Sequence, residues 1–183
     1  MAGRQTVIHS MHDLGLAAWF GGSLFGAVGL NGAAAAVRDA ADRPRVASIG
    51  WAKWAPVNGA AIVVHGIGAL SLLTKNSGRV VAQSGAGSNT ALKSVLTVAA
   101  VGATVWSGLN GAKLAKHSPT PAAGATDPTP ATDPEAAQAQ KQLKLLQWSI
   151  PVLTGALLLL SVEQAEQQKP SQLVKGLLPG GRA

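Results

Sequence analysis

The stretch LGLAAWFGGSLFGAVGLNGAAAAV, residues 14–37, decides how this chain folds, because it holds no charged side chain. Three further stretches without charge follow, at residues 55–74, 94–112 and 145–162. A helix of roughly 17–25 apolar residues spans the hydrocarbon core of a bilayer. A helix of a water-soluble bundle would instead carry a polar stripe. The sequence therefore predicts an all-α integral membrane protein, a four-helix bundle.

We expect a single membrane domain over residues 1–183, with helices at about 7–37, 54–74, 90–114 and 145–164. The Gly/Ser-rich residues 75–89 are expected to form a loop between the second and third helices. Residues 117–134 consist mainly of Pro, Thr, Ala and Asp, which predicts a disordered low-complexity loop. Residues 166–183 are expected to form a polar tail.

Two of the predicted helices close on the same five residues, GLNGA, at 29–33 and again at 108–112. Each is followed by a polar loop and then by a Trp- and Pro-containing start of the next helix, WAPV at 54–57 and WSIPV at 148–152. This pattern predicts two tandem two-helix repeats. Because each repeat crosses the membrane twice, the repeats should be related by an axis along the membrane normal.

The composition excludes several functional classes. Without cysteine the chain has no disulfide, thiolate metal site or thiol nucleophile. The formal net charge of +7 comes from residues that flank the apolar stretches, where basic side chains meet anionic lipid headgroups. No basic stripe with interleaved aromatics indicates nucleic acid. No Ser/His/Asp set, phosphate loop or pair of intramembrane carboxylates indicates an enzyme. The basic residues are nearly equal in number on the two sides of the membrane. Those of the short first loop favour placing this loop inside, which puts both termini outside.

Small residues recur on one face of two predicted helices, where they let neighbouring helices approach closely. On the first helix this face holds Gly15, Gly22, Gly26 and Gly29, and on the third it holds Thr104 and Gly108. We expect all six at helix–helix contacts, either within one chain or between subunits.

Three asparagines, Asn31, Asn58 and Asn110, fall at a similar predicted depth, near an interfacial belt of tryptophans. Their amides can link helices by hydrogen bonds, which is the simpler interpretation. They can also line a polar vestibule for a solute.

The second predicted helix places His65 near the bilayer centre, where an ionisable group should face the bundle interior. His65 could ligate haem or a metal ion, transfer protons, or form a structural hydrogen bond as a neutral imidazole. His12 lies with His9 and Asp13 at the start of the first helix, a set too small for a complete metal site. Counted from the helix ends, His12 and His65 differ in depth by roughly 12–15 Å, so a haem iron held by both is not expected.

The segment His12-x6-Trp19-Phe20-Gly21-Gly22, followed by Leu24-Phe25, resembles the first helix of CopD-type copper-resistance proteins. It is also similar to the start of HemJ-type protoporphyrinogen oxidases, which are four-helix haem-binding proteins. The resemblance implies that His12 is a haem or metal ligand. It covers the first helix only: a HemJ-type helix continues with Tyr and Arg, and CopD-type proteins have more helices. The Ala/Gly-rich composition resembles that of small membrane proteins from high-GC actinobacteria.

Taken together, these features predict a multi-pass protein of the cell membrane with a structural or accessory role. It would pack against itself or another membrane protein within the lipid bilayer, without a cofactor. One alternative is a haem- or metal-binding membrane redox protein that uses His65 and His12. The other is a small-solute carrier that uses the polar asparagines.

Overall fold

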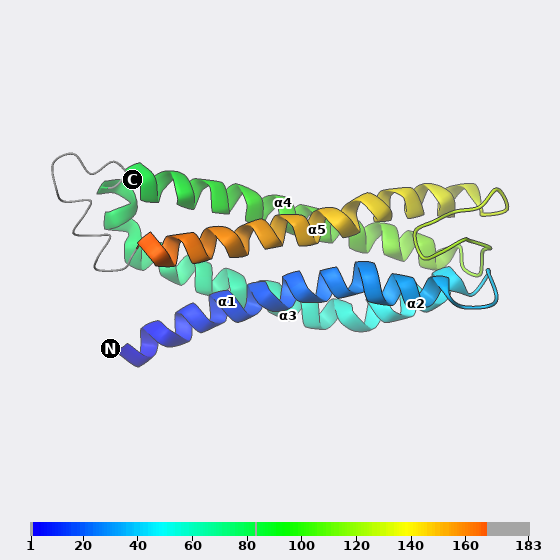
Figure 1. Cartoon of the computed structure of the whole chain (residues 1–183), viewed down its shortest axis with the longest axis horizontal. Coiled ribbons are helices and arrows are strands. Elements are labelled where there is room, and N and C mark those ends of the chain that lie inside the picture. Colours follow the sequence, from blue (N-terminus) through cyan, green and yellow to red (C-terminus); the bar gives the residue numbers. More distant parts are fainter. Residues whose placement is uncertain (1, 83, 168–183) are drawn as a thin grey trace.

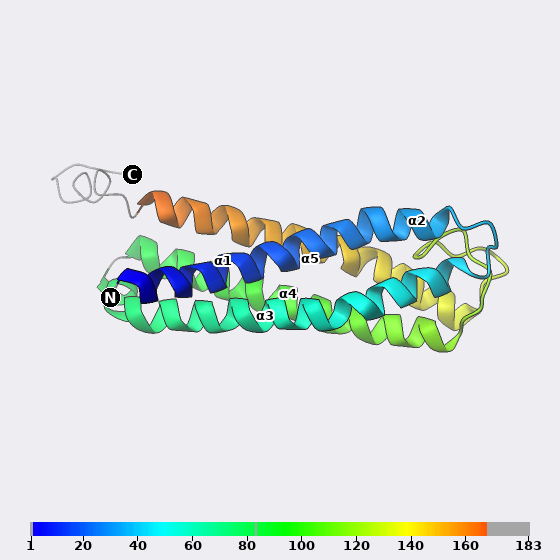
Figure 2. The same ribbon diagram turned by 90° about the horizontal axis from the view of Figure 1, so that it is seen from below.

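The computed structural model describes residues 2–82 and 84–167 of the chain. Four long helical rods lie side by side in an all-α bundle (Figures 1 and 2). The first rod is formed by α1, a short π-helix η1 and α2, and the other three are α3, α4 and α5. Their bounds are Ala2–Phe25 for α1, Gly26–Leu30 for η1, Asn31–Ala35 for α2, Arg43–Ala82 for α3, Ser84–Lys116 for α4 and Pro134–Gln167 for α5.

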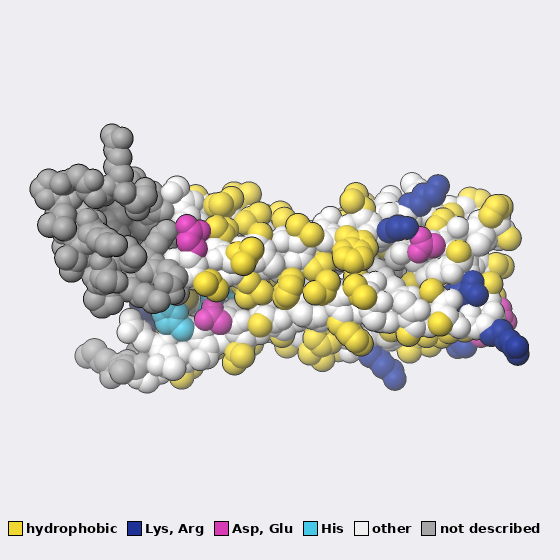
Figure 3. Space-filling model, in the orientation of Figure 1, with side chains coloured by type: hydrophobic (Ala, Val, Ile, Leu, Met, Phe, Trp, Pro, Cys, Tyr) yellow, Lys and Arg dark blue, Asp and Glu magenta, His cyan; other side chains and the backbone are white. Residues whose placement is uncertain are grey.

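Each rod contains a segment that is long and apolar enough to cross a membrane. The four segments are Gln5–Ala35, Arg43–Lys75, Ser88–Lys116 and Pro134–Glu163. Large apolar side chains point outward along the rods, and on the face in Figure 3 the Lys and Arg side chains gather mostly towards one end. This is the architecture of a multi-pass membrane protein, as expected from the charge-free stretches.

The helices form two antiparallel pairs, α1 with α3 and α4 with α5. The pairs join through contacts of α1 with α5 and of α3 with α4. A central core of Leu16, Trp19, Ala100, Ile150 and Leu157 connects all the rods except α3, whose Ile62 packs against it. Two hairpins are what a tandem repeat would produce, but the repeat itself stays a prediction.

The glycines of α1 differ in what they contact. An added Cβ at Gly15 would lie 2.6 Å from the Ala61 carbonyl oxygen and 2.6 Å from the His65 nitrogen, so α1 and α3 touch there backbone to backbone. Gly22 and Gly26 instead make room for tryptophan rings, Trp54 and Trp51 respectively. The expected close approach of helices therefore occurs at Gly15, about two helical turns from Gly22 and about three from Gly26.

Two other expected packing glycines do not mediate helix contacts. The three atoms nearest to a Cβ at Gly29 would all belong to Phe25 of the same rod, and a Cβ at Gly108 would meet nothing within 4 Å. The row on α4 makes its contact through Thr104, whose hydroxyl accepts a hydrogen bond from the Trp19 indole at 3.2 Å. The prediction for Gly29 and Gly108 was wrong because spacing places a residue on a face but does not say what lies opposite.

The helices extend beyond the charge-free stretches, and the flank at residues 135–144 is rich in good helix formers. Residues 43–53 begin α3 and residues 134–144 begin α5, so Pro56 and Pro151 lie inside helices. The loop expected at 75–89 is helical in its described part. The expected tail at 166–183 contributes the last two residues of α5, and the rest of it lies outside the described residues.

The segment between α4 and α5, expected to be disordered, is instead folded against the end of the bundle. The Ala122 amide donates to the Ala40 carbonyl at 3.1 Å, and the Arg43 guanidinium donates to the Ala122 carbonyl at 3.2 Å. From α5, the fully buried Gln140 donates to the carbonyls of Gly124 and Ala125, both at 3.1 Å. Composition alone missed this because the stabilising donors come from distant helices.

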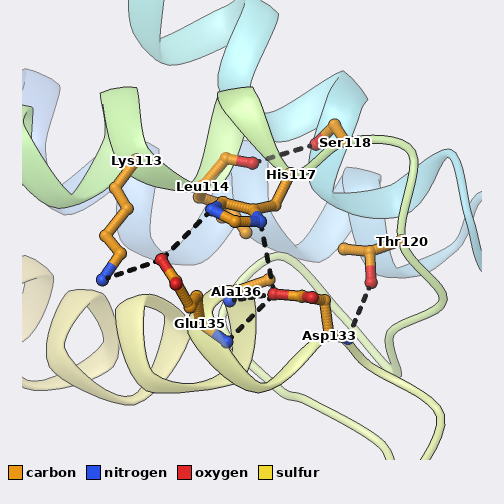
Figure 4. A network of polar contacts seen from close by, with 8 residues as sticks. All are labelled: Lys113, Leu114, His117, Ser118, Thr120, Asp133, Glu135 and Ala136. Carbon is orange, nitrogen blue, oxygen red and sulfur yellow. Dashed lines mark hydrogen bonds and ion pairs between the residues drawn. The ribbon is translucent and has the colours of Figure 1, made fainter.

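An exposed ion-pair cluster joins the two ends of this segment (Figure 4). His117 lies between two carboxylates, 3.3 Å from Asp133 and 3.4 Å from Glu135. Lys113 adds a contact to Glu135 at 3.5 Å. Asp133 also caps α5, because its carboxylate accepts the amides of Glu135 and Ala136. We call the end of the bundle that carries this segment the loop end.

Candidate functional site: two interior cavities

The crossing of α1 and α3 brings His12 and His65 together. Gly68 of α3 leaves room for the backbone of His12, as Gly15 does for that of His65. The two imidazole rings lie 4.5 Å apart between centroids, with an interplanar angle of 43°. The depth difference expected from the sequence was therefore wrong. It was counted from assumed helix ends, whereas α1 begins at Ala2 and α3 continues to Ala82.

Both histidines are held by hydrogen bonds at Nδ1. His12 Nδ1 lies 2.7 Å from Asp13 Oδ1, and His65 Nδ1 lies 3.0 Å from the His12 carbonyl oxygen. Because an ionised carboxylate and a carbonyl can only accept, each neutral imidazole carries its proton on Nδ1. The Nε2 atoms are then lone-pair acceptors. His65 is only 2% exposed, and its Nε2 is buried without a hydrogen-bond partner among the described residues.

A cavity of about 300 Å³ borders these histidines, and we call it the histidine cavity. Its walls are mainly leucine, valine and alanine from all four rods, and its polar side comes from α4. Lys93 is the basic residue of this lining, and its charge acts on both imidazoles. Lys93 was not among the predicted site residues, although a lysine inside a predicted membrane helix is itself a signal of function.

The histidine pair does not fit a haem held by both residues. Two axial imidazoles bind on opposite faces of the porphyrin, with their nitrogens separated by two metal–nitrogen bonds of about 2 Å each. Their ring centroids must lie farther apart still. At 4.5 Å, with backbone contacts at Gly15 and Gly68, no macrocycle can pass between the rings. Within residues 2–82 and 84–167, no three His, Cys, Asp or Glu side chains cluster to hold a metal ion.

A second cavity of about 300 Å³ lies towards the loop end, and we call it the tryptophan cavity. Trp51, Trp54 and Asn58 of α3 line it together with Asn31 and Gln147. Asn31 links three rods, because its amide donates to Gln147 Oε1 at 2.6 Å and its oxygen accepts the Trp51 indole at 3.0 Å. This is the interhelical role expected of Asn31.

The other two asparagines behave differently. Asn110 donates to the Trp106 carbonyl of its own helix at 2.9 Å, so the expected interhelical bond is not made. Asn58 lines the tryptophan cavity, and its Oδ1 is buried without a hydrogen-bond partner in the described structure. The same is true of the Trp54 indole nitrogen. A free acceptor and a free donor thus occur together, one helical turn apart on α3.

The two cavities share no lining residue. Between them lies the buried indole of Trp19, which donates to Thr104 on the tryptophan-cavity side and lies 6.3 Å from the His65 ring on the other. Leu16 and Leu157 continue this wall towards the histidine cavity, and Ile150 continues it towards the tryptophan cavity. The bundle interior is therefore divided into two chambers.

Comparisons with protein-family models, with curated proteins and with solved structures gave no match for this chain. The resemblance of the first helix to CopD-type and HemJ-type proteins therefore stays an expectation.

Proposed function

We propose that the chain is a small multi-pass protein of the cell membrane that binds a lipophilic acid in the histidine cavity and accepts its proton on His65. The observation that carries this proposal is the buried, unpartnered Nε2 of His65. A buried acceptor without a partner costs about 1–3 kcal/mol. An O–H group of a ligand would offset that cost.

The rest of the cavity suits an acid with an apolar tail. Leucine and valine side chains from several rods provide the apolar walls. Lys93 supplies a positive charge beside the histidines, which stabilises the anion left after the proton has moved. Ionisable side chains within membrane segments are expensive to bury and are commonly functional.

The proposed step is a proton transfer from the bound acid to His65. The O–H bond of the acid breaks, its electron pair stays on the oxygen, and the proton forms a bond with Nε2 of His65. The resulting imidazolium keeps its Nδ1 hydrogen bond to the His12 carbonyl. Asp13, whose side chain is 61% exposed, holds the neighbouring His12 and can exchange protons with water. A haem held by both histidines is not proposed, because the two rings leave no room for the macrocycle between them.

Binding of octanoic acid tests this function. The acid, labelled with ¹³C at the carboxyl group, is titrated into the full chain in nanodiscs of neutral lipid, and the ¹³C signal reports binding. His65→Gln replaces the imidazole by an uncharged amide and so removes the basic nitrogen. We expect saturable binding that weakens about tenfold or more in this variant, a loss of at least about 1.4 kcal/mol.

His9→Gln is the matched control, because His9 is exposed and does not line the cavity. Binding should be unchanged in this variant. If octanoic acid binds wild type and His65→Gln with equal affinity, the proposed function is wrong. The ¹⁵N shift of His65 Nε2 adds a second readout, since it must report a new N–H bond when the acid is bound.

A structural or accessory role in an oligomer or a larger membrane complex is a second candidate, supported by the exposure of α4. Only 6% of its apolar segment is buried, compared with 28% in each of the segments of the first rod and α5. Since the chain has no cysteine, single cysteines can test this face by cross-linking. Gly102→Cys on α4 should cross-link between chains in membranes, and Gly21→Cys on α1 is the control. Both glycines have open space around them.

A further inference from the structure

The tryptophan cavity holds a donor and an acceptor that nothing in the described structure satisfies. Trp54 Nε1 and Asn58 Oδ1 are both buried without hydrogen-bond partners. They lie four residues apart on α3, so they occupy the same face of the helix. The Trp54 ring is seated in the gap left by Gly22, which fixes the direction of its N–H group.

Several other polar side chains that line this cavity already have partners. Ser23 donates to the Trp19 carbonyl, and Thr104 both accepts from Trp19 and donates to the Ala100 carbonyl. Asn31 donates to Gln147 and accepts from Trp51. Among the atoms of this lining, Trp54 Nε1 and Asn58 Oδ1 combine burial with the lack of a partner in the described structure.

Among the described residues, no charged side chain lines the tryptophan cavity, whose walls are largely alanine, tryptophan, leucine and isoleucine. An ion would lose its hydration there without gaining a counter-charge, so charged ligands are excluded. A pure hydrocarbon would leave the donor and the acceptor unpaired. A hydroxyl group meets both requirements, because a single oxygen accepts one hydrogen bond and donates another.

We propose that the tryptophan cavity binds an uncharged amphiphile through its hydroxyl group, which accepts from Trp54 Nε1 and donates to Asn58 Oδ1. The apolar chain of the ligand fills the remaining volume of about 300 Å³. The tryptophan-rich level of the bundle is where membrane interfaces lie, and neutral alcohols concentrate there. This site is independent of the proton-accepting histidine cavity, with which it shares no lining residue.

The test uses the full chain in nanodiscs, with its five tryptophans replaced by 5-fluorotryptophan and read by ¹⁹F NMR. The probes are 1-octanol, octane, octanoate and octylammonium, which share a chain length and differ in the head group. We expect the Trp54 resonance to shift saturably with 1-octanol and to show no saturable shift with the other three.

Asn58→Ala should weaken 1-octanol binding about fivefold or more, because it removes the acceptor. Asn110→Ala is the matched control, since Asn110 is also buried but bonds within its own helix and does not line the cavity. Octane binding as well as 1-octanol, a shift that grows linearly without saturation, or unchanged affinity in Asn58→Ala would each overturn the proposal. Octanoate titrated against His65→Gln reports on the histidine cavity alone, so failure at one site is distinguishable from failure at the other.

Discussion

The two cavities have the same volume, about 300 Å³, and α3 contributes to both, yet they suit opposite ligands. The histidine cavity contains two imidazoles and Lys93, so it favours a ligand that gives up a proton. The tryptophan cavity contains amides, hydroxyls and indoles without charge, so it favours a neutral one. The unsatisfied polar atoms, and not the size or the apolar walls, distinguish one chamber from the other.

The largest effect is expected from Gly15→Leu, which should disrupt the histidine cavity. The atoms that face Gly15 belong to the α3 backbone, so they cannot turn aside as a side chain could. Overpacking typically costs about 1–3 kcal/mol, and here we expect the upper end of that range or more. The melting temperature in detergent measures the loss. Gly59→Leu on α3, where an added Cβ meets nothing within 4 Å and which lines neither cavity, should change it little.

Gly22→Leu should damage the tryptophan cavity by displacing the Trp54 ring. The clash is with a side chain, so part of the strain can relax, and we expect a loss of about 1–3 kcal/mol. Gly21→Leu is the neighbouring control, because open space surrounds Gly21. Thermal unfolding compares the two. Equal stability of both variants would show that the ring does not occupy the gap at Gly22.

Gln140→Ala should open the loop end without affecting the histidine cavity. It leaves the carbonyls of Gly124 and Ala125 without their donor, and Ala125 lines the tryptophan cavity. We expect the free energy needed to open the loop end to fall by about 1–2 kcal/mol. Hydrogen exchange should rise at residues 122–126 and stay unchanged around His65. Uniformly faster exchange along α1 and α3 would contradict this division of the molecule.

His117→Gln should have the smallest effect, because its ion pairs with Asp133 and Glu135 are partly exposed. Pairs of this kind contribute about 0.2–1 kcal/mol and weaken in salt. The difference in melting temperature between wild type and variant should shrink further in 1 M NaCl. A loss as large as that of Gly22→Leu would mean that the cluster in Figure 4 stabilises the bundle far more than exposed charges do.

Most of the fold could be predicted from the sequence because a charge-free stretch of sufficient length allows few structures in a membrane. Helix ends were less predictable, since polar flanks such as 134–144 continue a helix beyond the apolar stretch. The folded segment between α4 and α5 was missed because its hydrogen-bond donors lie outside it. Arg43 is remote in sequence, and Gln140 belongs to α5.

The candidate sites were harder to predict than the fold. The importance of His65 follows from a single ionisable residue in an apolar helix. Its contact with His12 depends on how far α1 slides along α3, which Gly15 and Gly68 determine and which spacing within one helix cannot reveal. The asparagines make the same point, because Asn31 and Asn110 occupy equivalent positions of the GLNGA segments but bond to different kinds of partner.

The wall formed by Trp19 has an electrical consequence. The buried Trp19 indole lies between the two cavities, and Leu16, Leu157 and Ile150 extend the wall that it forms. This wall interrupts any column of water along the bundle axis. Ions meet a low-dielectric barrier in the middle of the bilayer, so the protein should insulate the membrane and leave its resting voltage intact. Replacing Trp19 by a small residue would remove the centre of this barrier. The leak current across a planar bilayer that contains the variant would show how much of the electrical resistance depends on this side chain.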